Sequence, residues 1–471
     1  MSDDFLTREQ TENYGRYVAE PNEVQLARYF HLDERDLAFI NQRRGKHNRL
    51  GIALQLTTAR FLGTFLPDPL QIPSFIRFYI AAQLNISRPE ILSRYAEREN
   101  TRWEHQGLIK LYYDYHDFGD FPWTFRLKRL LYTRAWLSNE RPGLLFDFAT
   151  AWLLQNKILL PAASTLTRLI GEVRERASRR LWRRLALLPD SWQKTQLDGL
   201  LEIPEGQRIS VLEEMRKGPV TISGPSFTDA LERYTRLRSM EFSRLNFSGL
   251  PAIQLRNLAR YAGMASVKYI SRMPDERRLA VLTAFVKAQE ISALDEAVDV
   301  LDMLILDITR SAKNIGQKKR LRTLKDLDRA ALLLARACTL LLDENTDEAA
   351  LRQAIFRRIP KDKLAESVGK VNELARPQDT QFQDEMVEQY GRVKRFLSAM
   401  LRDLHFQAAP AGELTLSAIH YLAELSGSKK RILDDAPEQI ISGPWKRLVY
   451  DRDGRILRAG YSLCLLERLQ D

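Results

Sequence analysis

A cluster of cations around a glycine is the first group of residues that could bind a ligand. Like charges this close repel one another unless an anion lies against them. Arginine forks match phosphate oxygens in particular, so the cluster predicts contact with a polyanion. Its members are Arg43, Arg44, Lys46 and Arg49.

The residues around this cluster predict two helices joined by a turn. A short helix is expected over residues 33–42, Gly45 can adopt the positive φ of a tight turn, and His47 or Asn48 can begin the next helix. This is the outline of a helix-turn-helix, whose second helix presents its N-terminal residues to a DNA groove. The same outline also joins many pairs of packed helices, so a purely structural turn remains an alternative.

An arginine-rich helix is predicted after an apolar helix that ends near Asn156 and a turn over residues 157–161. Ser164 is a good N-cap for this second helix. Its first turn is then placed to reach base edges or phosphates. The candidate contacts are Lys157 in the turn and Ser164, Thr165, Thr167 and Arg168 at the helix start.

The rest of this helix carries more positive charge than it can neutralise. Two carboxylates, Glu172 and Glu175, stand against seven guanidinium groups, so a phosphate backbone is the expected partner and a solvated basic helix is the alternative. The seven are Arg168, Arg174, Arg176, Arg179, Arg180, Arg183 and Arg184.

A third basic strip follows two aromatic residues, Trp123 and Phe125. Its cations could clamp a DNA backbone, although core packing explains the aromatic residues at least as well. The cations are Arg126, Lys128 and Arg129.

Catalytic groups are harder to find. The six histidines show no metal-ligand spacing, and no HExxH motif, cysteine pair, phosphate-binding glycine loop or GxSxG elbow occurs. Asp295, Asp299 and Asp302 line one helical face and suggest Mg²⁺, but the wet side of an amphipathic helix explains them better. We therefore expect neither a metal site nor a complete enzyme; a self-sufficient nuclease would instead nick supercoiled DNA with Mg²⁺.

Composition favours a folded, DNA-binding protein. With 471 residues the chain predicts two to four domains, and 44% hydrophobic against 28% charged residues excludes a disordered protein. A formal charge of +11 favours nucleic acid over a membrane as partner. The polar N-terminus, the absence of a long apolar run, and two cysteines expected in the core, Cys338 and Cys464, predict a cytoplasmic protein.

Helical periodicity dominates the chain and predicts an all-α fold. Its clearest stripe is Ile291, Leu294, Val298, Leu301, Ile305 and Ile308. An Asp-Gly pair between β-formers in RLVYDRDGRIL predicts one small C-terminal β-hairpin. The predicted divisions are a DNA-binding module at residues 1–116, a second helix-turn-helix-like module at 117–201, a linker at 202–227 and a helical scaffold and dimerisation region at 228–471.

Four segments carry a pattern of higher specificity. The first is LTREQTENYGRYVAEPNEVQLARYFHLDERDLAFINQRRGKHNRLGIALQLTTARFLGTFLPD at residues 6–68, and the others lie at residues 152–185, 275–305 and 444–471. Together they resemble the N-terminal region of the replicative transposases of class II (Tn-three-type) transposons. The resemblance covers nearly the whole chain.

This resemblance implies a helical protein that binds the terminal inverted repeats of a transposon as double-stranded DNA, with dimer-forming helices after the DNA-binding modules. It also implies a separate RNase H-like domain beyond Asp471, whose Asp-Asp-Glu triad uses Mg²⁺, so no catalytic residue or cofactor is carried over to this chain. DNA contacts are carried over to the helix from Ser164 to Arg184 and to Arg43, Arg44, Lys46, Asn48 and Arg49. The alternative function is a non-catalytic helical adaptor or RNA-binding scaffold.

Overall fold

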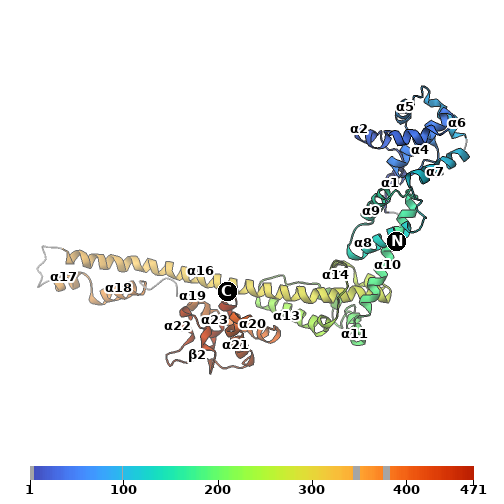
Figure 1. The fold of residues 1–471 in the computed structure, drawn as a ribbon. Helices are drawn as coiled ribbons and strands as arrows, with labels where there is room; N and C mark the ends of the chain where they lie inside the picture. Colours follow the sequence, from blue (N-terminus) through green and yellow to red (C-terminus); the bar gives the residue numbers. More distant parts are fainter. Residues whose placement is uncertain (1–4, 98, 343–350, 375–381, 471) are drawn as a thin grey trace. The chain divides into compact units, whose positions relative to one another are not determined.

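The computed structural model describes residues 5–97, 99–342, 351–374 and 382–470 (Figure 1). These residues are mainly α-helical, and one two-stranded antiparallel sheet is the only sheet among them. The predicted all-α class is therefore confirmed. None of the described helices is long and apolar enough to cross a membrane.

The chain forms two compact units, of which the first comprises Met1–Leu197 and Leu245–Phe285. In chain order, this unit begins with α1 (Arg8–Asn13), α2 (Glu23–Gln25), a π-helical turn η1 (Leu26–Phe30), α3 (Glu34–Asn41), α4 (Lys46–Leu62), η2 (Pro69–Gln71), α5 (Ser74–Gln83), η3 (Pro89–Ile91), α6 (Leu92–Ala96) and α7 (Glu99–Tyr113). They are followed by α8 (Trp123–Leu137), α9 (Pro142–Gln155), α10 (Ala163–Ala186), α11 (Ser191–Gly199), α14 (Ala252–Met264), α15 (Val267–Ser271) and the start of α16 (Asp275–Leu341).

Helix α4 is the centre of the first core in this unit. Its residues from Leu50 to Ala59 are all buried, because α3, α5, α6 and α7 surround it. Gly51 permits the close approach of α6, since a Cβ there would lie 2.3 Å from the ring of Tyr95. A second core joins α8, α9 and α10, and a smaller cluster joins α10 to α14 and α16.

The second unit comprises Asp198–Arg244 and Val286–Asp471. One large hydrophobic cluster joins α13, the middle of α16 and the helices from α19 onward. Its helices are α12 (Val211–Met215), α13 (Gly224–Ser239), η4 (Phe242–Arg244), α16 from Val286, α17 (Leu351–Arg358), α18 (Lys361–Leu374), α19 (Phe382–Glu388), α20 (Tyr390–Asp403), η6 (Pro410–Gly412), α21 (Glu413–Glu424), η7 (Glu438–Ile440), η8 (Gly443–Trp445), α22 (Lys446–Val449) and α23 (Arg458–Gln470).

The buried face of α16 differs in part from the predicted stripe. Leu301, Ile305 and Ile308 are buried, but Ile291 and Val298 are 55% and 46% exposed. The helix also buries small residues, including Ala293 and Ala297. The neighbouring helices, and not apolar character alone, therefore select the buried face.

The two cysteines have different environments. Cys464 is buried as predicted, and burial raises the pKa of its thiol. Cys338 is exposed, so its prediction as a core residue was wrong. Ala330, Ala337 and Leu340, on this part of α16, are buried instead.

The C-terminal sheet pairs β1 (Ile432–Leu433) with β2 (Ile456–Leu457). The predicted Asp-Gly turn exists, with Gly454 at φ 78° and a single bridge between Tyr450 and Ile456. The first predicted arm is wrong, however, because its residues form α22, and β2 takes its strand partner from upstream in the chain. The predicted four-part division of the chain stays a prediction.

Candidate nucleic-acid interface

Gly45 connects α3 and α4 as predicted. Its φ is 83°, and α4 begins at Lys46, just before the predicted start at His47 or Asn48. A side chain at this position would be strained by the positive φ and would meet the ring of His47 at 2.9 Å. The helix, glycine turn and helix are thus confirmed, while their docking into a DNA groove stays a prediction.

The cations around Gly45 form no ion pair within the described part of the chain. Arg49 donates from Nε to the carbonyl of Arg43 at 3.0 Å, and the amide of Asn48 donates to the carbonyl of Arg44 at 2.9 Å. These two bonds close the turn, so Arg49 and Asn48 have a structural role there. Arg44 and Lys46 are exposed, and they are the members of the cluster most available to an anion.

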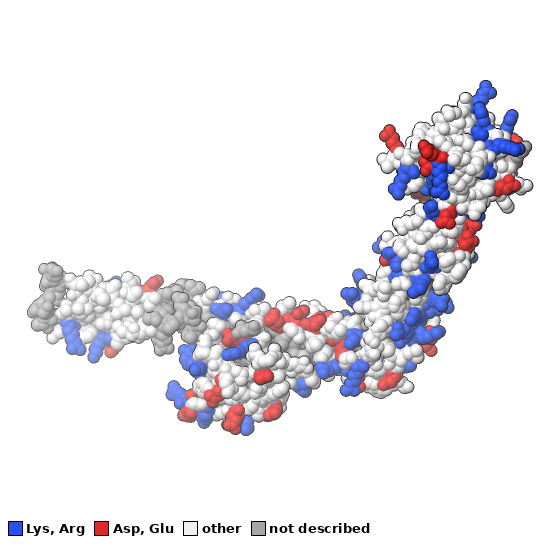
Figure 2. Space-filling view, viewed as in Figure 1, with Lys and Arg blue, Asp and Glu red and all other residues white. Residues whose placement is uncertain are grey.

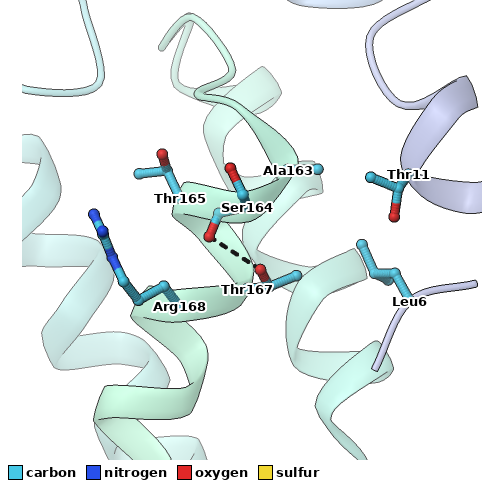
Figure 3. Close-up of a pocket in the computed structure, with 7 residues that line it drawn as sticks. All are labelled: Leu6, Thr11, Ala163, Ser164, Thr165, Thr167 and Arg168. Atoms are coloured by element: carbon cyan, nitrogen blue, oxygen red, sulfur yellow. Dashed lines mark hydrogen bonds between the residues drawn. The ribbon is translucent and has the colours of Figure 1, made fainter. Parts of the chain in front are cut away.

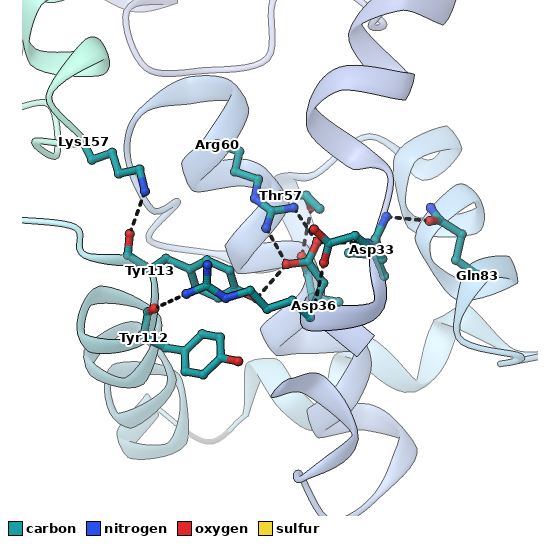
Figure 4. A network of polar contacts seen from close by, with 11 residues as sticks. Asp33, Asp36, Thr57, Arg60, Gln83, Tyr112, Tyr113 and Lys157 are labelled. Carbon is teal, nitrogen blue, oxygen red and sulfur yellow. Dashed lines mark hydrogen bonds and ion pairs between the residues drawn. The ribbon is translucent and has the colours of Figure 1, made fainter. Parts of the chain in front are cut away.

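A buried ion pair fixes α3 against α4 (Figure 4). Arg60 donates to both carboxylate oxygens of Asp36, at 2.7 and 2.5 Å, and the Tyr113 hydroxyl donates to the same carboxylate at 2.7 Å. Burial would raise the pKa of Asp36, but the bonds from Arg60 and Tyr113 lower it below its usual range. The network therefore holds a charged Asp36 and sets the geometry of the helices that carry the cation cluster.

A second polar chain joins α4 to α6 and α7. The Gln55 amide donates to the Tyr95 hydroxyl at 2.8 Å, which leaves that hydroxyl free to donate to Nδ1 of buried His105 at 3.0 Å. Burial, together with the positive charge of Arg43, lowers the pKa of His105 to about 4. His105 is thus neutral in the folded protein near pH 6.

This lowered pKa predicts a pH-dependent stability of the first unit. Between about pH 6.5 and 4 the unfolded imidazole binds a proton that the folded one does not, so the free energy of unfolding should decrease as pH falls through this window, by about 2 kcal/mol. Hydrogen exchange at α7 amides, followed as a function of pH, measures this free energy. His105→Gln should flatten its dependence on pH, whereas the exposed control His31→Gln should leave that dependence unchanged. If His105→Gln also leaves it unchanged, another group causes the pH dependence.

The basic strip of α8 is exposed, with Arg126, Lys128 and Arg129 unpaired by any carboxylate in the described residues. Trp123 is half-buried and packs 6.4 Å from Trp152 and 4.9 Å from His116, as the core interpretation predicts. Phe125 differs, since it is 62% exposed. The two aromatic residues thus have separate roles.

The start of α10 differs from its prediction at the N-cap. The helix begins at Ala163 with Ala162 at the N-cap, so Ser164 lies in the first turn and its prediction as the cap was wrong. Leu166 is fully buried in the second core, and Thr167 next to it is buried, with its hydroxyl donating to the carbonyl of Ser164 at 3.0 Å. Thr167 also lines the pocket at this helix start, so its role as a DNA contact stays a prediction.

A pocket of about 490 Å³ opens at this helix start (Figure 3). Leu6 and Thr11 face it from the N-terminal segment, while Thr165 and Arg168 line it from α10. Ser164 and Arg168 are exposed, so they remain available. Lys157 precedes the helix at φ 55° and donates to the carbonyl of Tyr113 at 3.1 Å, which gives it a structural role.

Most of the arginines predicted on α10 gather along one groove of the helix. Five exposed arginines and two glutamates line a groove of about 520 Å³, and Figure 2 shows basic side chains gathered around α10. We call this surface the arginine face; it consists of Arg176, Arg179, Arg180, Arg183 and Arg184.

Carboxylates engage only part of this face. Arg179 pairs with Glu175 at 2.7 Å, and Arg183 lies 3.6 Å from Glu276 of α16. Arg180 instead donates to the Tyr132 hydroxyl at 3.1 Å and lies 5.1 Å from the Trp136 ring, and Arg184 donates to the carbonyl of Gly249 at 3.2 Å. Positive charge therefore exceeds negative charge along the groove.

The two other arginines of the helix differ from this face. Exposed Arg168 lies 4.0 Å from Glu172, at the outer limit of an ion pair. Arg174 is half-buried, and burial lowers the pKa of its guanidinium. The support that Tyr132 and Trp136 give to Arg180 was not predicted, although their spacing of four on α8 places them on one helical face.

The candidate magnesium carboxylates Asp295, Asp299 and Asp302 are all exposed on α16, which confirms the wet side of an amphipathic helix. Across residues 5–97, 99–342, 351–374 and 382–470, no three His, Cys, Asp or Glu side chains are grouped to hold a metal ion.

Comparison with known proteins gives a family match and several relatives. Residues 5–173 match the family described as "Domain of unknown function (DUF4158)". The chain is 78% identical over 471 residues to the transposase for transposon gamma-delta of Escherichia coli (strain K12), and it covers 47% of that protein. The transposase for transposon Tn501 of Pseudomonas aeruginosa is 28% identical over 97% of this chain and 46% of the relative.

A third relative extends the match to another organism. The transposase for transposon Tn1546 of Enterococcus faecium is 27% identical over 99% of this chain and 47% of its own length. The chain thus spans about half the length of the curated relatives it matches. It is therefore similar, throughout its length, to the transposases of several transposons, as the resemblance of its four segments predicted.

Proposed function

We propose that the chain binds duplex DNA at the terminal inverted repeats of a transposon, as the DNA-recognition part of a replicative, cointegrate-forming transposase. The observation that carries this proposal is the arginine face of α10, where exposed guanidinium groups outnumber the carboxylates that engage them. Guanidinium groups bind phosphates bidentately, and their number along one helix suits a repeating backbone.

Two other surfaces of the first unit support the proposal. The exposed Arg44 and Lys46 lie at the positive end of the α4 dipole, which favours a phosphate. Exposed Arg168 lies on the second turn of α10 and lines the pocket at the start of that helix. The relatives are transposases for transposons, which makes transposon DNA the polyanion of choice.

In this proposal the phosphate contacts set affinity, and groove contacts from the starts of α4 and α10 set sequence preference. Residues 228–471 serve as scaffold and as the surface of a homodimer. We assign no catalytic step or cofactor to the described residues; strand cutting and joining, with Mg²⁺, belong to an RNase H-like domain.

Competition binding tests the proposal. The protein is bound to a labelled duplex carrying the terminal repeat and challenged with the unlabelled repeat, a scrambled duplex of equal composition, or a structured RNA of equal charge. The repeat duplex should compete at least tenfold better than either alternative. Equal competition by the RNA would support a general polyanion scaffold and exclude this function.

The Gly45 turn gives a separate prediction. Replacing Arg44 and Lys46 with Ala should lower affinity for the repeat duplex about tenfold and reduce the slope of log affinity against log salt by roughly 2, because two phosphate contacts are lost. Anisotropy titrations at several salt concentrations measure both. The structure predicts no loss of thermal stability, since both side chains are exposed; normal affinity would make the cluster purely structural.

A further inference from the structure

Phe125 lies in an unusual position, on a helix rich in cations. Helix α8 contains Arg126, Lys128, Arg129 and Arg134 and no carboxylate. Its core-facing residues Leu127 and Leu131 are fully buried, while Phe125 is 62% exposed. Phe121, in the turn that leads into the helix, is 88% exposed. Two exposed apolar rings four residues apart, beside these cations, indicate an interaction surface.

The spacing along α8 connects Phe125 to the arginine face. Residues separated by four, three and four positions share one side of a helix, and Phe125, Arg129, Tyr132 and Trp136 have this spacing. Tyr132 and Trp136 are the residues that contact Arg180. The exposed ring is therefore on the same side of α8 as the aromatic support of the arginine face.

The charge around the ring selects its partner. An apolar protein partner would give the cations beside the ring nothing to bind. Duplex DNA, in contrast, offers phosphates for the cations and apolar base faces for the ring. Arg126, Lys128 and Arg129 are exposed and free of carboxylate partners in the described residues, so phosphates complement them. Phenylalanine is among the side chains that pack against thymine methyl groups or insert at a base step.

We propose that Phe125 contacts the bases of the terminal repeat, packing its ring against a base step while Arg129 and its neighbouring cations hold the phosphates. This inference rests on the proposed function and adds the residue that reads base identity or deformability there. A base contact changes specificity, whereas a phosphate contact changes affinity for every sequence and its salt dependence. This difference makes the two kinds of residue separable.

The test compares full-chain variants on the repeat duplex and a scrambled duplex. Phe125→Ala should lower affinity for the repeat about tenfold. It should leave affinity for the scrambled duplex and the slope of log affinity against log salt unchanged. Phe125→Trp should retain the preference and show quenching of its indole fluorescence on binding. Arg129→Ala should weaken both duplexes and reduce the salt slope by roughly 1. Phe78, on α5, has a ring that is 56% exposed, so Phe78→Ala is the matched control. It should bind both duplexes with the affinity of the unmodified protein.

Two results would overturn the inference while leaving the proposed function intact. One is a Phe125→Ala protein with the normal preference for the repeat. The other is an equal loss on repeat and scrambled duplexes, which would assign the ring to general binding or to folding. Failure of the unmodified protein to prefer the repeat would instead overturn the proposed function, and the base contact with it.

Discussion

Replacing Arg179, Arg180, Arg183 and Arg184 together with Ala is expected to lower affinity for the repeat duplex by about a hundredfold. Loss of a charge-assisted contact costs on the order of 1 kcal/mol, and Arg179 and Arg183 already have carboxylate neighbours, so about 3 kcal/mol in total is expected. The salt slope should fall by roughly 2 to 4, depending on how many of the four reach phosphates. Anisotropy titrations from low to physiological salt measure both quantities.

A charge-matched control separates this local effect from the general attraction of a basic protein. Arg357, Arg358, Lys361 and Lys363 are exposed cations of the second unit, and their replacement with Ala changes the net charge equally. This control should change affinity much less than the α10 variant does. If the two variants lose affinity to the same extent, net charge would explain the binding, and the arginine face would have no specific role.

Breaking the buried ion pair should give the largest loss of stability. Arg60→Ala leaves the Asp36 carboxylate buried with Tyr113 as its one side-chain donor among the described residues, and we expect the first unit to lose about 3 to 5 kcal/mol. Hydrogen exchange at α4 amides measures the loss. Arg8→Ala, which removes an exposed ion pair with Glu12, should cost less than about 0.5 kcal/mol.

A double replacement tests whether the buried charge or the lost packing is responsible. Asp36→Leu combined with Arg60→Met removes both charges and keeps apolar volume, so it should cost much less than Arg60→Ala. Equal losses would show that packing, not the unpaired charge, causes the effect. Because α3 and α4 carry the Gly45 cluster, Arg60→Ala should also weaken DNA binding through misplacement of Arg44 and Lys46.

The pH dependence of this pair is distinct from that of His105. The folded-state pKa of Asp36 is lowered, so its contribution is complete above the unfolded value of about 4 and decreases as pH falls through the folded value. The loss of stability due to His105 comes earlier on acidification, as pH falls from about 6.5 to 4. Two successive losses of stability are therefore expected on acidification.

Local properties of the sequence determined the helices, the glycine turn and the identity of the basic residues. The capping box at Asp33, the positive φ of Gly45 and the period of α10 depend on residues within one or two turns. For that reason α3, α4 and α10 lie close to their predicted positions, and the arginine face was predicted residue by residue.

Tertiary contacts decided which of these residues are available and which are structural. Asp36 and Arg60 are 24 residues apart, and Arg180 meets Tyr132 from 48 residues away, so no local pattern could pair them. The same contacts bury Thr167, leave Phe125 exposed, and leave Ile291 and Cys338 outside the core. Helical periodicity indicates that a residue lies on an apolar or basic face, but its burial depends on whether another element packs against that face. That is a property of the folded chain.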